Sequence, residues 1–411
     1  MSKDARNVPA LRFKGYSDAW EKRKLGEIFN VVTDYVANGS FKSLRQRVST
    51  YSNPNFAYMI RLQDASNNWK GPWLYTDQQS YSFLAKTKLN PGDILMSNVG
   101  SVGKFFLVPD LDRPMTLAPN AILLRSMTYS TYFLFQLLQT SSMTESINEK
   151  TTPGVQQKIN KTDLKKIITN VPTLNESSMV GQMLSLLDNL IAATQRRINA
   201  LEEIKEASSQ YLFVQEWKFR GYSSPWKQVK LGEIADIIGG GTPKTDEPKF
   251  WNGKIDWYAP AEIGSNRYVS GSVRTITSVG LNKSSASILP ANRTILFTSR
   301  AGIGNAAILK KDAATNQGFQ SLVLKDGVDV YFMYSKIPEI KQKAIRIAAG
   351  STFLEISGKK LSQIALLVPE LNEQQRIGAF FKKLDDLTAA NHSKVSRLNL
   401  LKRFLLQGLF I

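Results

Sequence analysis

Several loops of the chain combine basic and amide side chains with glycine or aromatic residues. The stretch "KSLRQR" (Lys42–Arg47) is basic, and "NNWKGPW" (Asn67–Trp73) and "KFWNGKIDWY" (Lys249–Tyr258) interleave aromatic residues with Lys and Asn. The stretches "SNVGSVGK" (97–104) and "TSRAGIGN" (298–305) place glycines beside Asn, Lys and Arg. Glycine lets a backbone approach a phosphate closely, and Arg, Asn and Gln can pair with purine edges. These residue types therefore suit contacts with DNA.

Each of these stretches also has an ordinary structural interpretation. Trp side chains usually pack in cores, and Lys and Arg usually face solvent. Twelve residues are candidates for DNA contact by their type and their position in loops. They are Lys42, Arg45, Arg47, Lys70, Asn98, Lys104, Thr242, Lys244, Lys254, Arg267, Arg300 and Asn305.

Motifs that would support catalysis by the chain itself are incomplete. "SNPNF" (Ser52–Phe56) is similar to the Asn-Pro-Pro-Phe/Tyr loop of adenine methyltransferases, but Asn55 replaces the second proline and no glycine-rich cofactor loop accompanies it. "GSVGKF" (Gly100–Phe105) has Phe where a phosphate loop needs Ser or Thr, and "GGGTPKT" (Gly239–Thr245) lacks the Gly-Lys-Ser/Thr end. We interpret all three as turns.

Metal and acid–base chemistry also lack the necessary residues. The chain has no Cys and one His, His392, so neither a thiolate site nor a catalytic triad can be assembled. Asp385 and Asp386 are predicted to be solvated helix charges, as charge runs usually are. We therefore predict no catalytic residue and no metal site in this chain.

Composition limits the class of protein. A chain of 411 residues with 42% hydrophobic residues is long enough for two or three globular domains. The net charge of +19 favours a polyanionic partner, nucleic acid before an anionic membrane. The absence of Cys suits a reducing cytoplasm. We expect no secretion signal in the first 15 residues and no membrane span.

The chain repeats itself. "FKGYSDAWEKRKLGEI" (Phe13–Ile28) matches "FRGYSSPWKQVKLGEI" (Phe219–Ile234) at an offset of 206 residues. "VPTLNESSMVGQMLSLLDNL" (Val171–Leu190) matches "VPELNEQQRIGAFFKKLDDL" (Val368–Leu387) at an offset of 197. The chain is therefore predicted to consist of two tandem units, the second with shorter loops.

Each unit begins with a mixed part. We predict strands at "DILMSNV" and "AILLRSM" in the first unit and at "TILFTSR" and "SLVLKDG" in the second. One helical stretch follows in each, "YFLFQLLQTSSMTESI" and "YFMYSKIPEIKQKAI", and Pro338 starts or kinks the second. The predicted fold class is mixed α/β (α+β).

Each unit ends in a heptad seam. Apolar residues recur at alternating steps of four and three over about 36 residues, which predicts a helix roughly 54 Å long. Asn175 and Asn372 are the expected N-caps, and Gln375 can complete a capping box. The central seam residues are Leu187, Ile191, Thr194 and Ile198 in the first helix, and Leu384, Asn391, Val395 and Leu398 in the second.

The two helices are predicted to pair with each other in antiparallel orientation. The first helix ends acidic, with Glu202, Glu203 and Glu206, and the second begins with Arg376, Lys382 and Lys383. Antiparallel pairing would also bring the polar seam residues Thr194 and Asn391 together near the middle. The alternative is that the helices pack on their own globular parts or on another chain. The helices carry net charges of −2 and +4, so +17 of the total belongs to the mixed parts.

This arrangement resembles the specificity subunit of type I restriction–modification systems. The phrase "PELNEQQRIGAFFKKLD" (Pro369–Asp385), the "W-x-x-x-K-L-G-E-I" head of each unit, and "GGGTP" with "FWNGKIDW" are characteristic of that family. The resemblance spans essentially the whole chain. The first helix departs from the pattern, because Ser177 and Ser178 stand where the second has Gln374 and Gln375.

The resemblance implies a DNA-recognition function. Residues 1–173 and 215–370 would be two target recognition domains, each reading one half of a split sequence in double-stranded DNA. Residues 174–214 and 371–411 would be spacer helices in an antiparallel coiled coil with pseudo-twofold symmetry. Two rival interpretations stay open: a free-standing tandem DNA-binding regulator, and a coiled-coil scaffold that binds RNA or protein.

The resemblance also implies partners. Two methyltransferase subunits would bring S-adenosylmethionine and adenine-N6 methylation. Two restriction–translocase subunits would bring ATP and Mg. This chain would hold no cofactor and would act in the bacterial cytoplasm.

Overall fold

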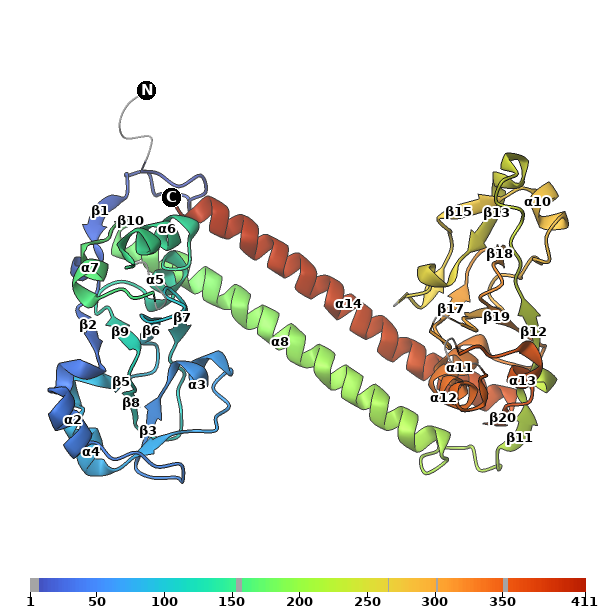
Figure 1. Cartoon of the computed structure of the whole chain (residues 1–411), viewed down its shortest axis with the longest axis horizontal. Coiled ribbons are helices and arrows are strands. Elements are labelled where there is room, and N and C mark those ends of the chain that lie inside the picture. Colours follow the sequence, from blue (N-terminus) through green and yellow to red (C-terminus); the bar gives the residue numbers. More distant parts are fainter. Residues whose placement is uncertain (1–6, 153–156, 265, 301, 350–353) are drawn as a thin grey trace. The chain divides into compact units, whose positions relative to one another are not determined.

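The computed structural model describes residues 7–152, 157–264, 266–300, 302–349 and 354–411 (Figure 1). It divides into two compact units. Unit 1 comprises Met1–Gln195 with Ser393–Ile411, and unit 2 comprises Arg196–His392. Two long helices, α8 (Leu174–Phe213) and α14 (Leu371–Leu409), each contribute one half to either unit. The predicted mixed α/β fold with two repeated parts and two long helices is confirmed.

Unit 1 contains three sheets. Its strands are β1 (Glu21–Lys24), β2 (Val31–Asp34), β3 (Ala57–Ile60), β4 (Tyr75–Thr76), β5 (Lys88–Leu89), β6 (Ile94–Ser97), β7 (Phe105–Leu107), β8 (Met115–Leu117), β9 (Ala121–Arg125) and β10 (Ile168–Val171). The sheet orders are β2-β9-β6-β7, β4-β3-β8-β5 and β1-β10. Its shorter helices are α1 (Leu25–Ile28), α2 (Phe41–Arg47), α3 (Leu62–Ser66), α4 (Gln78–Phe83), α5 (Thr131–Leu137), α6 (Ser141–Lys150) and α7 (Lys161–Lys166).

Unit 2 repeats this plan. Its strands are β11 (Lys227–Lys230), β12 (Ala235–Gly239), β13 (Trp251–Tyr258), β14 (Tyr268–Val269), β15 (Arg274–Ile276), β16 (Thr294–Phe297), β17 (Ala306–Leu309), β18 (Ala313–Thr315), β19 (Gln320–Leu324) and β20 (Ala365–Val368). The sheet orders are β12-β19-β16-β17-β14, β15-β13-β18 and β11-β20. Its shorter helices are α9 (Leu231–Ile234), α10 (Ser278–Asn282), α11 (Val330–Ser335), α12 (Ile337–Ile347) and α13 (Gly358–Ser362).

The repeated "KLGEI" joins the first strand of each unit to a one-turn helix. Leu25 and Leu231 are buried, and their amides donate to Ile167 O (2.8 Å) and Ile364 O (2.9 Å) at the far end of the same unit. The glycine that follows lies close to the next element, since a Cβ on Gly232 would stand 2.9 Å from a side-chain carbon of α13. The motif therefore closes each unit on itself.

Both long helices begin two residues earlier than the sequence suggests. The N-cap prediction of Asn175 and Asn372 is wrong. The Thr173 hydroxyl accepts from Glu176 N (3.3 Å), and Glu370 O accepts from Gln374 N (3.0 Å). Gln375 was expected to complete a capping box, but the buried glutamine is Gln374. Its Nε2 donates to Pro369 O (2.9 Å), just before the helix.

The two helices run antiparallel within unit 2. As the residue numbers rise along α8, the numbers of the residues they contact on α14 fall. Three contacts show this: Glu202 with His392 (3.6 Å), Lys205 with Asp385 (2.7 Å), and Phe213 stacked on Phe381 (5.4 Å between ring centroids). The predicted antiparallel orientation is therefore confirmed here. The prediction placed acidic residues of α8 against basic residues of α14, whereas the Lys205–Asp385 pair has the opposite signs. The salt bridge joins a Lys of α8 to an Asp of α14.

Unit 1 shows the equivalent pair. Lys402 of α14 lies 2.7 Å from Asp188 of α8, and these two residues match Lys205 and Asp385 at the offset of 197. Thr194 and Asn391 are buried, but each donates to a carbonyl oxygen of its own helix, four residues earlier. The predicted polar pair between them stays a prediction.

The predicted single stretch at 132–147 is two helices, α5 and α6, and Pro338 stands in the first turn of α12.

Each helix is fixed to its unit at a glycine. A Cβ on Gly181 would overlap the hydroxyl of Ser130, the N-cap of α5. A Cβ on Gly378 would overlap the carboxylate of Asp329, the N-cap of α11. Small residues at this one position let α5 and α11 lie directly against the long helices (Figure 1).

Unit 2 contains a buried lysine. Lys336 is 1% exposed; its Nζ lies 2.7 Å from Glu339 and 4.9 Å and 5.5 Å from the ring centroids of Phe213 and Trp226. Burial lowers the pKa of Lys336. Burial would raise the pKa of Glu339, but Lys336 and Lys343 hold that pKa below its ordinary value. The Glu339 carboxylate therefore balances a charge that the core cannot solvate.

We predict that Gly181→Ala and Gly378→Ala each lower the free energy of unfolding by about 1–3 kcal/mol, as overpacking does. Alanine normally stabilises an open helix position relative to glycine by about 1 kcal/mol, so the sign itself reports the clash. Urea unfolding gives the measurement, with the exposed neighbour Gln182→Ala as control. Stabilisation by either glycine substitution would contradict the docking.

We predict that Glu339→Gln costs roughly 3–5 kcal/mol, because it leaves Lys336 buried without its partner. Lys336→Leu should cost about 1 kcal/mol or less, since the position equivalent in the repeat is the buried Leu137. The reverse change, Leu137→Lys, should be strongly destabilising. The Glu339→Gln deficit should shrink as pH falls below the ordinary carboxyl pKa of 4.5, because a lowered folded-state pKa stabilises only above that range. Equal costs for the two unit 2 variants would contradict this account.

Candidate nucleic-acid interface

The structure places the twelve candidates on loops and short elements of both units. In unit 1, Lys42, Arg45 and Arg47 lie on α2, Lys70 follows α3, and Asn98 and Lys104 flank the turn between β6 and β7. In unit 2, Thr242 and Lys244 follow β12, Lys254 lies in β13, Arg267 precedes β14, and Arg300 and Asn305 flank the turn between β16 and β17.

The β6–β7 and β16–β17 turns have the same construction. The hydroxyl of Ser97 accepts from Lys104 N (3.0 Å) and donates to Ser101 O. The hydroxyl of Thr298 accepts from Asn305 N (3.0 Å) and donates to Gly302 O (2.6 Å). One hydroxyl thus closes each turn, so "GSVGKF" is a hairpin turn rather than a phosphate loop.

The residue after the closing hydroxyl is buried in both units. Asn98 is 8% exposed and Ser299 is fully buried. Among the residues that the structure describes, Asn98 Oδ1 and Ser299 Oγ find no hydrogen-bond partner, and they stand at equivalent positions of the repeat. Buried polar atoms are nearly always satisfied, so each such case calls for an explanation.

The basic face of α2 is exposed. Ser40 caps the helix by accepting from Ser43 N (3.2 Å), and Leu44 is the residue that α2 buries. Lys42, Arg45 and Arg47 are all exposed, and the Arg47 guanidinium lies 5.3 Å from the Phe83 ring centroid. This seven-residue helix therefore buries only Leu44 and exposes its three basic side chains to solvent.

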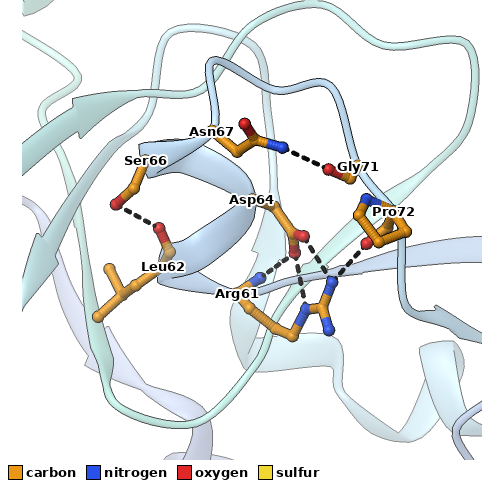
Figure 2. A network of polar contacts seen from close by, with 7 residues as sticks. All are labelled: Arg61, Leu62, Asp64, Ser66, Asn67, Gly71 and Pro72. Carbon is orange, nitrogen blue, oxygen red and sulfur yellow. Dashed lines mark hydrogen bonds and ion pairs between the residues drawn. The ribbon is translucent and has the colours of Figure 1, made fainter. Parts of the chain in front are cut away.

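The loop between α3 and β4 is held by its own polar contacts (Figure 2). The Arg61 guanidinium donates to both oxygens of Asp64, at 2.6 Å and 3.0 Å, and to Pro72 O (2.6 Å). The Asn67 amide donates to Gly71 O (2.6 Å). Because these bonds satisfy the loop internally, Lys70 projects exposed from a fixed backbone.

The aromatic residues of the predicted contact stretches are mostly structural. Trp73 lies 4.6 Å from Tyr58 between ring centroids, and Trp69 packs against the same cluster. In unit 2, Trp257 Nε1 donates to Gly241 O (2.8 Å), and Trp251 Nε1 donates to Lys244 O (3.0 Å). The ordinary structural interpretation of these tryptophans, packing in the core, is therefore correct.

The triple glycine of unit 2 is also structural. A Cβ on Gly240 would overlap the backbone oxygens of Thr315 and Asn316, and one on Gly241 would lie 2.5 Å from Ala286 N. The Thr242 hydroxyl that follows is hydrogen-bonded to Gln317. Of the candidates in this region, Lys244 and Lys254 are exposed, and we leave the half-buried Thr242 out of the interface proposed below.

Arg267 is engaged inside unit 2. Its guanidinium donates to Tyr331 Oη (2.8 Å) and lies 2.9 Å from Asp386, which also pairs with Lys382. Tyr331 Oη in turn donates to Asp385 (2.7 Å), and burial and that bond raise the pKa of Tyr331. The prediction that Asp385 is a solvated charge is therefore wrong, and we remove Arg267 from the interface proposed below.

Some features were missed by the sequence reasoning. Arg274 is exposed and lies 3.6 Å from the Trp251 ring centroid and 5.5 Å from that of Trp257. Phe41 is 80% exposed at the start of α2. The stretch "SNPNF" forms a local turn, since Asn55 Oδ1 accepts from Phe56 N (2.8 Å).

Neither a metal cluster nor a membrane helix is found in the described part of the chain. Within those residues, no three His, Cys, Asp or Glu side chains stand close enough to bind a metal ion. The same residues contain no helix long and apolar enough to cross a bilayer.

Two repeated mixed units on a pair of long helices are an architecture seen before. A crystal structure of a type I restriction–modification S subunit from M. genitalium is similar, with a TM-score of 0.60 and 19% identity over 98% of this chain and 99% of that one. The family model described as type I restriction modification DNA specificity domain matches residues 17–203 and again 223–400. The chain belongs to this family.

Two relatives of known family match the chain over part of their length. The chain is 36% identical to the MjaIX specificity subunit of Methanocaldococcus jannaschii over 166 residues, which is 39% of this chain and 38% of that protein. It is 25% identical to a putative MjaX specificity subunit of the same organism over 348 residues, 80% of each. The chain thus spans about two fifths of the first relative and four fifths of the second.

Proposed function

We propose that this chain is the DNA-recognition subunit of a type I restriction–modification complex. Residues 1–173 and 215–370 act as two target recognition domains, and each reads one half of a bipartite site in double-stranded DNA. The observation that carries the proposal is the repeat itself. The two units share their helix-docking glycines and closing hydroxyls, but differ in the loop residues that flank them.

Charge supports DNA as the ligand. Among the residues that the structure describes, Lys42, Lys70 and Lys104 lack a carboxylate partner. All three are exposed in unit 1, Lys42 on α2 and the other two on separate loops. Lys244 and Lys254 are exposed in unit 2. Basic side chains held on fixed loops without acidic partners suit a phosphate backbone. Arg45, Arg47, Asn98, Arg300 and Asn305 complete the proposed interface.

The spacer helices, residues 174–214 and 371–411, dock the other subunits. They expose apolar side chains that a solvated helix does not need: Leu174, Met179, Leu186, Leu190 and Ile204 on α8, and Leu371, Leu400, Leu401 and Phe404 on α14. Two methyltransferase and two restriction subunits are the proposed partners. They bring S-adenosylmethionine, ATP and Mg, while this chain contributes no catalytic group and works in the bacterial cytoplasm.

The decisive experiment maps methylated adenines in DNA exposed to this chain with its methyltransferase. We expect a split sequence with a nonspecific gap. Exchanging residues 15–170 for those of a relative should change one half-site and leave the other, because unit 1 has its own core. Since Leu409 and Phe410 close that core, the exchange must retain the residues that face them. A continuous site, or a change in both halves, would contradict the proposal.

We predict that Lys42→Ala, Lys70→Ala and Lys104→Ala each weaken DNA binding without changing the recognised sequence. Each lost phosphate contact should lower the slope of log affinity against log salt by about 0.9. Fluorescence-based titrations of the assembled complex at several salt concentrations give this slope. Lys14→Ala, also exposed in unit 1, is the matched control. Tighter binding to RNA than to duplex DNA would favour the scaffold interpretation instead.

A further inference from the structure

Unit 1 contains a pocket beside α2 that the description of the interface leaves unexplained. Its volume is about 530 Å³, within the range of small-ligand sites. Residues of α2, the end of β6, the start of β9 and the start of α7 line it. Phe41, Arg45, Asn98 and Lys158 are the lining residues whose chemistry points to a ligand.

Asn98 is the most informative of the four. It is 92% buried, and its Oδ1 accepts no hydrogen bond from any residue in the described part of the chain. An acceptor in that state has lost its water without gaining a partner, which is costly. Asn98 lines the pocket, so an N–H donor that entered it and displaced the atoms covering Oδ1 would remove that cost. The pocket therefore favours a ligand that carries an amino or imino group.

The charges around the pocket favour an anion at its edge. Asp34 is neutralised by Lys161, whose Nζ lies 2.7 Å from its carboxylate. Arg45 and Lys158 have no carboxylate partner among the residues that the structure describes, and both are exposed. Two free cations beside a buried acceptor match a ligand with an anionic backbone and a neutral polar ring.

Phe41 supplies a stacking surface. It lines the same pocket, yet 80% of its area is exposed, which is unusual for a phenylalanine. Aromatic side chains beside basic residues stack on the bases of nucleic acid strands. A base that remains stacked in a duplex presents only its groove edges, and these do not reach a buried side chain inside a concave pocket.

We propose that this pocket takes one unstacked nucleobase of the DNA bound by unit 1. Phe41 stacks on the base, Asn98 Oδ1 accepts from an N–H of its Watson–Crick edge, and Arg45 and Lys158 contact the flanking phosphates. That N–H is the exocyclic amine of adenine, cytosine or guanine, or the ring N–H of guanine or thymine. The inference rests on the proposed function and adds to it a specificity-determining residue.

Unit 2 is built differently at the equivalent place. Ser299 replaces Asn98 and is fully buried, and the glycines after β12 pack directly on the backbone of residues 315–316. Directly after β12, Gly240 and Gly241 leave no room for any side chain, because a Cβ at either position would overlap neighbouring atoms. We therefore expect an unstacked base in the half-site of unit 1 and not in that of unit 2.

The test uses the complex of this chain with its methyltransferase, on duplexes carrying the mapped site. 2-Aminopurine is placed at each position of both half-sites in turn, and its fluorescence rises where the base leaves the stack. Methyltransferases extrude their target base as well, so the methylated adenines serve as an internal reference. We expect one further position in the first half-site to brighten, and a mismatch opposite it to tighten binding.

Variants assign that signal to the pocket. Phe41→Ala and Asn98→Ala should abolish the extra signal and weaken binding about 5- to 100-fold, while the signal at the methylated adenines persists. Lys14→Ala should leave both signals unchanged, and unchanged thermal unfolding shows that the variants fold. If no further position brightens, or if both variants retain the signal, the pocket does not take a base. If no bipartite methylation occurs at all, the proposed function itself fails.

Discussion

In each unit, one half-buried aspartate holds a long helix to the globular part, and the rest of the structure depends on this contact. Asp188 in unit 1 and Asp385 in unit 2 each accept from a tyrosine of the adjacent short helix and pair with a lysine of the other long helix. One carboxylate thus joins three elements. Burial and this bond raise the pKa of both tyrosines, so the phenols remain protonated donors across the physiological range. The glycine about two turns earlier allows the approach, because any larger residue would displace the N-cap of the short helix.

With the long helices held in this way, the polar side chains of the two units fall into two groups. Some support the fold, and others are left to contact a ligand. Arg61 and Arg267 are fully occupied by carboxylate and backbone or phenol partners, although their residue type suits DNA equally well. Lys42, Lys70 and Lys104 have the same charge but find no carboxylate partner within the described residues. Exposure and the absence of a carboxylate neighbour, rather than residue type, distinguish the two groups.

The sequence predicted the large features well because they are periodic or repeated. The heptad steps identified both long helices, and the matched phrases identified two units of one fold. Local details were harder. Thr173 and Glu370 displaced the expected caps, since their oxygens accept from amides of the first helical turn. Asp385 and Asp386 looked alike in sequence, yet only the fold shows that Tyr331 lies against the first. The pocket of unit 1 was not predictable, because α2, β6, β9 and α7 are far apart in sequence.

The positions where the two units differ are as informative as those where they agree. Substituting Leu137 by its repeat equivalent Lys336 required a new acid, Glu339, within 2.7 Å. Differences in the core are therefore costly and must be compensated locally. Differences in the loops need no such compensation, because bonds such as those of Arg61 and Asp64 satisfy each loop from within. A side chain at the loop surface, such as Lys70, can change without disturbing either the loop backbone or the frame. A chain built in this way can keep two equivalent supports while the two surfaces that face the ligand diverge independently.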